Sequence, residues 1–215
     1  MEANKVEIRP LIIAFVIIAC LEAFAKVVSA KGLLSQPMII LGVARLLDII
    51  VLTFVVSIWG DGLASIGLAQ ANMAKGFQKG LIWSAGFGIT TLVAFSILYG
   101  LGINALALIH MHLPKSSGKI ILFFFVGGIV GPIAEEILFR GILYGFFRRW
   151  GVLIALIVST LLFVLAHPVL PGIPVTQVVG GVVFALAYER ERSLMAPLTI
   201  HVLGNMAIFT LSFIS

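Results

Sequence analysis

Seven apolar stretches, most of them about 20 residues long, limit what this chain can fold into. They lie at residues 10–29, 38–59, 80–109, 119–147, 151–167, 173–188 and 194–214. An α-helix needs about 20 apolar residues to cross a bilayer, and a backbone in hydrocarbon must satisfy its own hydrogen bonds. The sequence therefore predicts an all-α fold, a polytopic transmembrane helical bundle with about seven spans.

The composition supports an integral membrane protein. Apolar residues make up 61% of the chain and charged residues only 11%, whereas soluble domains carry about 25% charge. The fifth and sixth stretches are short, and "YGLGIN" interrupts the long third one, so the predicted range is six to eight spans. We expect a single integral membrane domain over residues 1–215, with the catalytic motifs in 119–215. The first apolar run has no small-residue cleavage site behind it, so a removable signal peptide is not expected.

The basic residues predict an orientation. With the N-terminus inside, the inner segments hold eight basic residues: Lys5, Arg9, Lys75, Lys79, Arg148, Arg149, Arg190 and Arg192. The outer segments hold three: Lys31, Lys115 and Lys119. This distribution follows the positive-inside rule. It predicts a cytoplasmic N-terminus, and it explains the net charge of +5 without a nucleic-acid partner.

Some polar features have a structural explanation. Residues 60–80 are too polar to span and suit a helix lying at the membrane interface, ahead of the third span. Glu22 and Lys26 are four residues apart on one helix and can pair. Arg45 and Asp48 can pair at a spacing of three. Cys20 is the only cysteine, which excludes an internal disulfide and a cysteine-based metal site.

The fourth stretch contains "AEEILFRG" at residues 134–141, although carboxylates are costly in hydrocarbon. Glu136 and Arg140 are four residues apart and can form an ion pair on one helix face. Glu135 lies about 100° further round the helix and has no cation of its own, so it is the candidate general base. Pro132 precedes the pair and can bend the helix.

Two further motifs offer groups that could meet Glu135. "FVLAHP" places Phe163 and His167 on one helix face, and "HVLGN" places His201 and Asn205 on another. A carboxylate, two imidazoles and an amide suffice to activate water and to stabilise an oxyanion. The same carboxylate and imidazoles could instead hold a metal ion. Straight, upright helices would put these groups at different depths, so a common site requires tilt, the bend at Pro132 or span ends other than those predicted.

The residues "EEILFR", "FVLAH" and "HVLGN" resemble, in order and spacing, the EExxxR, FxxxH and HxxxN/B motifs of the CPBP family. This family comprises the CAAX-type prenyl endopeptidases and their bacterial and archaeal relatives, including Abi-related proteins. The resemblance is close over residues 120–215. Over the first hundred residues it is limited to hydropathy and to the element "GLASIGL".

The resemblance implies an all-helical, glutamic-type intramembrane endopeptidase. It makes Glu135 the water-activating base and His167 its partner. It makes His201 and Asn205 the oxyanion site. It gives supporting roles to Glu136, Arg140 and Phe163. We expect no cofactor; in the metal-dependent alternative, zinc would be held by Glu135, His167 and His201.

The expected substrate is a membrane-associated peptide or protein, and the expected location is a prokaryotic cell membrane. Two other classes remain open. A non-enzymatic immunity or scaffold protein would keep the fold without needing Glu135. A proton-coupled transporter would use the same acids and histidines as a relay, although no repeated halves are visible in the sequence.

Overall fold

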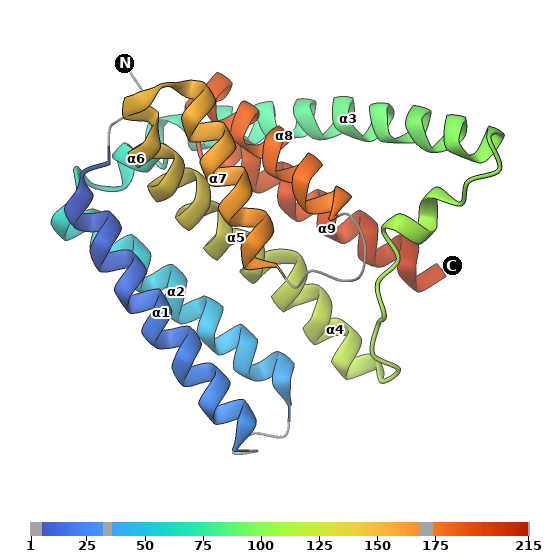
Figure 1. Ribbon diagram of the computed structural model, residues 1–215, viewed down its shortest axis with the longest axis horizontal. Coiled ribbons are helices and arrows are strands. Elements are labelled where there is room, and N and C mark those ends of the chain that lie inside the picture. The colour runs from blue at the N-terminus through green and yellow to red at the C-terminus, as the bar shows by residue number, and fades with distance from the viewer. Residues whose placement is uncertain (1–5, 32–35, 168–173, 215) are drawn as a thin grey trace.

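The computed structural model describes residues 6–31, 36–167 and 174–214, which form a bundle of helices (Figure 1). Six long helices are each regular: α1 Ile8–Ala30, α2 Pro37–Trp59, α3 Gln70–Gly100, α7 Val152–Ala166, α8 Val175–Glu191 and α9 Met195–Ile214. A seventh helical rod changes type along its length: α4 Ser117–Phe125, η3 Val126–Val130, α5 Gly131–Glu136, η4 Ile137–Tyr144, α6 Gly145–Phe147 and η5 Arg148–Trp150. Two short 3-10 turns are η1 Leu63–Ile66 and η2 Ala105–Leu108. No strand occurs among these residues, so the predicted all-α bundle is confirmed.

Within the described residues, five helical stretches are long and apolar enough to cross a membrane: Ile8–Ala30, Pro37–Trp59, Leu63–Gly100, Ser117–Trp150 and Met195–Ile214. Helix α7 is apolar but shorter, with 15 residues, and α8 has 17. Large apolar side chains stay exposed on the outside of the bundle, for example Ile82 at 65% and Leu92 at 68%. Such surface is stable only against lipid, as expected for an integral membrane protein.

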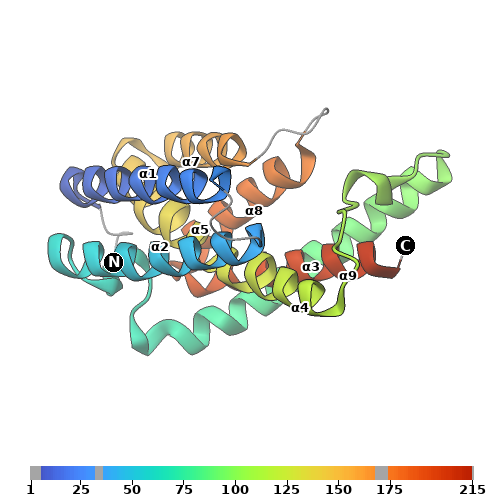
Figure 2. The same ribbon diagram turned by 90° about the horizontal axis from the view of Figure 1, so that it is seen from below.

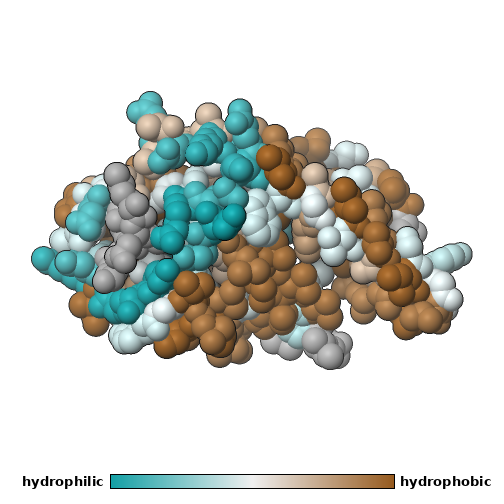
Figure 3. All heavy atoms as spheres, turned by 90° about the horizontal axis from the view of Figure 1, so that it is seen from above, coloured by the Kyte–Doolittle hydropathy of each residue, from teal (hydrophilic) through white to brown (hydrophobic). Residues whose placement is uncertain are grey.

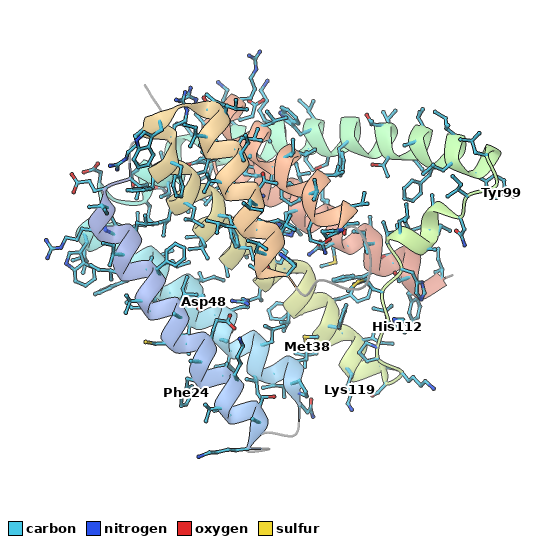
Figure 4. The ribbon with its side chains drawn as sticks, in the orientation of Figure 1. Phe24, Met38, Asp48, Tyr99, His112 and Lys119 are labelled. Carbon is cyan, nitrogen blue, oxygen red and sulfur yellow. The ribbon has the colours of Figure 1, made fainter. Side chains whose placement is uncertain are left out.

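Helices α1 and α2 lie side by side (Figures 1 and 2) and share a cluster of charges. Nη1 of Arg45 lies 2.7 Å from Oε1 of Glu22 and 2.6 Å from Oδ2 of Asp48. The predicted Arg45–Asp48 pair is therefore confirmed. The predicted Glu22–Lys26 pair is wrong, because Glu22 faces the neighbouring helix and Lys26 is exposed. Asp48 is 2% exposed and is labelled in Figure 4.

Helix α3 differs from the sequence prediction at both ends. It begins at Gln70, so the polar residues 70–79 are its first turns and not a separate interfacial helix. It ends at Gly100 instead of 109, since Gly102 takes a φ of 78° that breaks the helix. Its first turns pack on α9 because Gly76 and Gly80 have no side chains. Its far end, marked by Tyr99 in Figure 4, lies away from the bundle.

We predict that Gly80→Ala weakens the contact between α3 and α9. A Cβ atom at Gly80 would lie 2.6 Å from Cβ of Thr199 and 2.9 Å from the carbonyl oxygen of Ala196. Overpacking of this kind costs about 1–3 kcal/mol. Gly86→Ala is the matched control, because nothing lies within 4 Å of the added atom. Thermal unfolding in detergent would measure both; equal melting temperatures would contradict the packing described here.

Hydrophilic residues gather at one end of the bundle, where α3 and α9 begin and where η5 and α8 end (Figure 3). Several interactions tie this end together, among them three that join different elements. Arg148 Nε donates to Glu189 Oε2 over 2.9 Å, Trp83 Nε1 donates to Glu191 Oε1 over 3.0 Å, and Arg149 Nη2 donates to the Val6 carbonyl over 2.6 Å. Two other basic residues lie elsewhere: Lys31 follows the last residue of α1, and Lys119 lies in the first turn of α4. The cytoplasmic location of the N-terminus stays a prediction.

Candidate active site

Glu135 and Glu136 lie on α5, a short α-helical turn between two π-helical segments. Segment η3 precedes α5 and η4 follows it. In η3 the amide of Gly131 donates to the carbonyl of Val126, five residues back. π-Segments of this kind often occur at functional sites because they redirect the residues that follow. The two acidic residues are thus presented by the least regular part of the bundle.

Glu136 is the structural member of the pair. Its Oε1 atom accepts from Nη1 of Arg140 over 3.0 Å and lies 2.7 Å from Nδ1 of His201. Glu136 and Arg140 are both completely buried. The predicted ion pair is therefore confirmed. The link to His201 was not predicted, because it joins residues that are 65 positions apart.

Arg140 is held on its other sides as well. Nη2 donates to the Gly181 carbonyl over 3.2 Å. The guanidinium lies 4.5 Å from the ring centre of Phe163 and 5.1 Å from that of Phe184, within cation–π range. The ring of Phe184 also stacks on His201, with centroids 4.5 Å apart. Sequence analysis missed Phe184 and Gly181, since neither belongs to a polar pattern.

Glu135 lies between the two histidines. Its Oε2 atom is 3.6 Å from Nε2 of His167 and 3.7 Å from Nε2 of His201. Both distances are too long for a direct hydrogen bond, and Oε2 has no hydrogen-bond partner among the described residues. The side chains of Glu135 and His167 are 21% and 26% exposed. The structure thus brings Glu135, His167 and His201 together, as the sequence motifs predicted.

The partners of the two Nδ1 atoms determine what each Nε2 atom can do. Nδ1 of His167 lies 2.8 Å from the Phe163 carbonyl, which can only accept, so Nδ1 carries the proton. Nδ1 of His201 faces a carboxylate oxygen that already accepts from Arg140, so it too donates. In a neutral ring Nε2 is then an acceptor. Three acceptor atoms therefore converge on one point, which favours a proton donor such as water there.

Phe163 packs between the groups of the site. Its ring centre lies 4.5 Å from that of His167 and 5.8 Å from that of His201, and its side chain is 2% exposed. Its carbonyl orients His167. The predicted supporting position of Phe163 thus agrees with its contacts.

Asn205 bonds to the backbone of η3 and not to the other predicted site residues. Its Nδ2 atom donates to the carbonyl of Gly127 over 2.9 Å, and among the described residues no hydrogen bond joins Asn205 to Glu135, His167 or His201. The predicted oxyanion role of Asn205 stays a prediction. The sequence could not predict the hydrogen bond to Gly127. A backbone carbonyl in a helix normally accepts from an amide of the same helix, and the loss of that amide cannot be read from the sequence pattern.

Metal binding was the alternative for three of these residues. Within the described ranges, no group of three His, Cys, Asp or Glu side chains is arranged to hold a metal ion. Each histidine, however, has its Nδ1 atom tied to a carbonyl or carboxylate oxygen. Histidine ligands of metals are oriented in the same way.

Comparisons with known proteins point to peptidases of the membrane. Residues 117–207 match the family model described as type II CAAX prenyl endopeptidase Rce1-like. The chain is 39% identical over 94 residues to membrane-embedded CAAX protease MroQ of Staphylococcus aureus (strain USA300), covering 40% of this chain and 38% of the relative. It is 32% identical over 85 residues to "Putative membrane peptidase YdiL" of Bacillus subtilis (strain 168), covering 39% and 34%. The chain thus matches well under half the length of these relatives. No solved structure matches it.

Proposed function

We propose that this chain, which matches the Rce1-like family of type II CAAX prenyl endopeptidases over residues 117–207, is an intramembrane endopeptidase that uses Glu135 to activate water. One observation carries the proposal: the Oε2 atom of Glu135 has no hydrogen-bond partner in the part of the chain that the structure describes, and it lies within 3.7 Å of two imidazole Nε2 atoms. A helix kept only for packing would need the buried ion pair of Glu136 and Arg140, but it would not need a second acid, Glu135, between two imidazoles.

In the proposed reaction, water lies beside Glu135 and His167 and donates a hydrogen bond to each. The carboxylate of Glu135 takes the proton as water attacks the peptide carbonyl, and it later gives the proton to the leaving amine. His167 orients the water through Nε2, because its Nδ1 atom is committed to the Phe163 carbonyl.

His201 is proposed to stabilise the oxyanion, with the second amide hydrogen of Asn205 as a further donor. Nε2 of His201 can donate only when the ring is doubly protonated, since Nδ1 already donates to Glu136. The carboxylates of Glu135 and Glu136 lie on the two sides of this ring, 3.7 Å from its Nε2 atom and 2.7 Å from its Nδ1 atom. Arg140 holds Glu136 in place through the buried ion pair.

We propose a membrane-associated peptide or protein as the substrate. An apolar hollow lies between α2 and the α4–η3 region; it is lined by Ile39, Gly42, Val43, Leu46, Leu122, Phe125, Val126 and Val130. Segment η3 leads directly into the turn that carries Glu135. An apolar segment of the substrate would therefore approach the site from the bilayer, with its scissile bond beside the exposed edges of Glu135 and His167.

The metal-dependent version of the same protease is the second candidate, and the orientation of both histidines through Nδ1 is what favours it. In that version zinc would be held by Glu135, His167 and His201 at about 2.0–2.2 Å. We favour the metal-free version, because the carboxylate and the donors complete the chemistry without a further group.

Chelation separates the two versions. We predict full cleavage activity after exhaustive treatment with a strong chelator, and no stoichiometric zinc by elemental analysis of the purified protein. Glu135→Gln, treated in parallel, serves as the inactive control. Activity that disappears on chelation and returns with added zinc would contradict the metal-free assignment while leaving the endopeptidase itself in place.

A further inference from the structure

The carbonyl of Gly127 has lost both of its possible donors within its own helix. In an α-helix it would accept from the amide of Gly131, four residues on. That amide donates to Val126 instead. In a π-helix it would accept from residue 132, but Pro132 has no N–H group. Gly127 is partly buried, and a carbonyl within a membrane-spanning helix has no bulk water to replace a missing donor, so Gly127 depends on a group from another helix.

Asn205 of α9 supplies that partner, with Nδ2 at 2.9 Å from the Gly127 oxygen. The approach of α9 depends on the absence of side chains in η3. A Cβ atom at Gly127 would lie 3.3 Å from the ring of Phe209, and one at Gly128 would lie 2.6 Å from Cε of Met206. The amide bond therefore joins α9 to η3 at the point where the helical hydrogen bonds are interrupted.

The helix type of η3 decides where Glu135 points. A π-turn contains one residue more than an α-turn, so its loss would rotate the following residues by about 100° relative to α4. Glu135 follows η3 directly on α5, whereas His167 and His201 come from α7 and α9. Their distances of 3.6 and 3.7 Å to Glu135 thus require that η3 keeps its present register.

We propose that Asn205 is a positioning residue for Glu135. By donating to the carbonyl that Pro132 leaves without a partner, its amide holds the π-turn and thereby keeps Glu135 between the two histidines. The same bond fixes the direction of the amide group, so that its second hydrogen can serve the oxyanion. The positioning role rests on the proposed endopeptidase function, whereas the hydrogen bond between Asn205 and the Gly127 carbonyl does not depend on that function.

The test uses four forms of the full chain: the unchanged protein, Asn205→Ala, Pro132→Ala and the double variant. Alanine at position 132 restores a backbone N–H that can donate to the Gly127 carbonyl. We expect Asn205→Ala alone to lower kcat about 10²-fold, as small misplacements of catalytic groups do, with little change in KM. In the Pro132→Ala background the same change should lower kcat about tenfold less, because the carbonyl has its new donor and only the oxyanion hydrogen bond is lost.

Thermal unfolding of the same four proteins in lipid nanodiscs measures the bond without any substrate. Asn205→Ala should lower the melting temperature by about 3–8 °C in the unchanged background, and by much less beside Pro132→Ala. Thr210→Ala, an exposed change on the same helix, is the control and should leave kcat and melting unaltered.

The proposal requires that both kcat and melting temperature show this rescue. Rescue of melting alone would make Asn205 a stabilising residue with no positioning role, and equal losses of kcat in both backgrounds would leave it an oxyanion donor only; either result overturns the proposal. If the unchanged protein cleaves no membrane peptide, the proposed function fails, while the melting temperatures still decide whether the Asn205–Gly127 bond replaces the missing helical donor.

Discussion

Glu135→Gln is expected to lower peptide cleavage by about 10²- to 10⁴-fold, the range that general-base catalysis contributes. Glutamine keeps the shape of the side chain but cannot take the proton from water. Folding should change little, because Oε2 of Glu135 makes no direct hydrogen bond that the substitution would remove. Steady-state kinetics with a labelled membrane peptide, together with thermal unfolding, would measure both effects.

The neighbouring residue provides the matched control. Glu136→Gln should lose stability as well as activity, because Glu136 holds Arg140 and His201 in a fully buried network. The two acids differ by one position in the sequence, so hydropathy and helix propensity are the same for both changes. If the two variants lost equal stability, Glu135 would be a structural residue and a different base would be needed.

Arg140→Ala should produce the largest loss of stability among these variants, about 3–5 kcal/mol, because it leaves Glu136 buried without its cation. Arg140 also donates to the Gly181 carbonyl and contacts the ring of Phe163, and both contacts would be lost. Activity should fall with stability, since Glu136 orients His201. Denaturant unfolding in detergent and the peptide assay would measure the two effects.

Arg192→Ala is the control for Arg140→Ala. Arg192 pairs with Glu189 over 2.9 Å but is 40% exposed, and exposed pairs contribute only about 0–1 kcal/mol. A loss at position 140 no larger than that at position 192 would show that burial does not strengthen the Glu136–Arg140 pair. It would also remove the physical reason for treating Glu136 as the anchor of His201.

Hydropathy predicted most of the fold, because a bilayer dictates long apolar helices. The predicted stretches at 10–29 and 38–59 agree with α1 and α2 to within two residues at each end. The prediction failed for α3, where polar residues 70–79 continue the helix. Their packing comes from Gly76 and Gly80 against α9, and hydropathy carries no information about such a contact.

Spacing along one helix predicted pairs within that helix and missed those between helices. Glu136 and Arg140 pair as expected, and so do Arg45 and Asp48. Glu22 pairs with Arg45 across α1 and α2, which the i,i+4 rule cannot reveal. The link between Glu136 and His201 was missed for the same reason.

The sequence predicted only part of the irregularity of the helix that carries the site. Pro132 predicted a bend, and the different depths of the site residues in straight helices required a bend, a tilt or other span ends. The structure instead has π-segments on both sides of α5, and His167 lies at the end of α7. π-Turns have no propensity signal, since they depend on contacts such as the one between Asn205 and Gly127. The catalytic roles of Glu135, His167, His201 and Asn205 stay predictions.

The central claim is that this chain cuts peptide bonds of membrane substrates with Glu135. The most direct measurement incubates the purified protein, reconstituted in lipid, with candidate membrane peptides and identifies the products by mass. The peptides should include prenylated and unprenylated forms. We expect cleavage at a defined bond by the unchanged protein, incorporation of one oxygen atom from ¹⁸O-labelled water, and product formation at least about 10²-fold slower with Glu135→Gln. Product formation by Glu135→Gln at the unchanged rate would contradict the claim, and so would proton movement by the reconstituted protein without cleavage of any peptide.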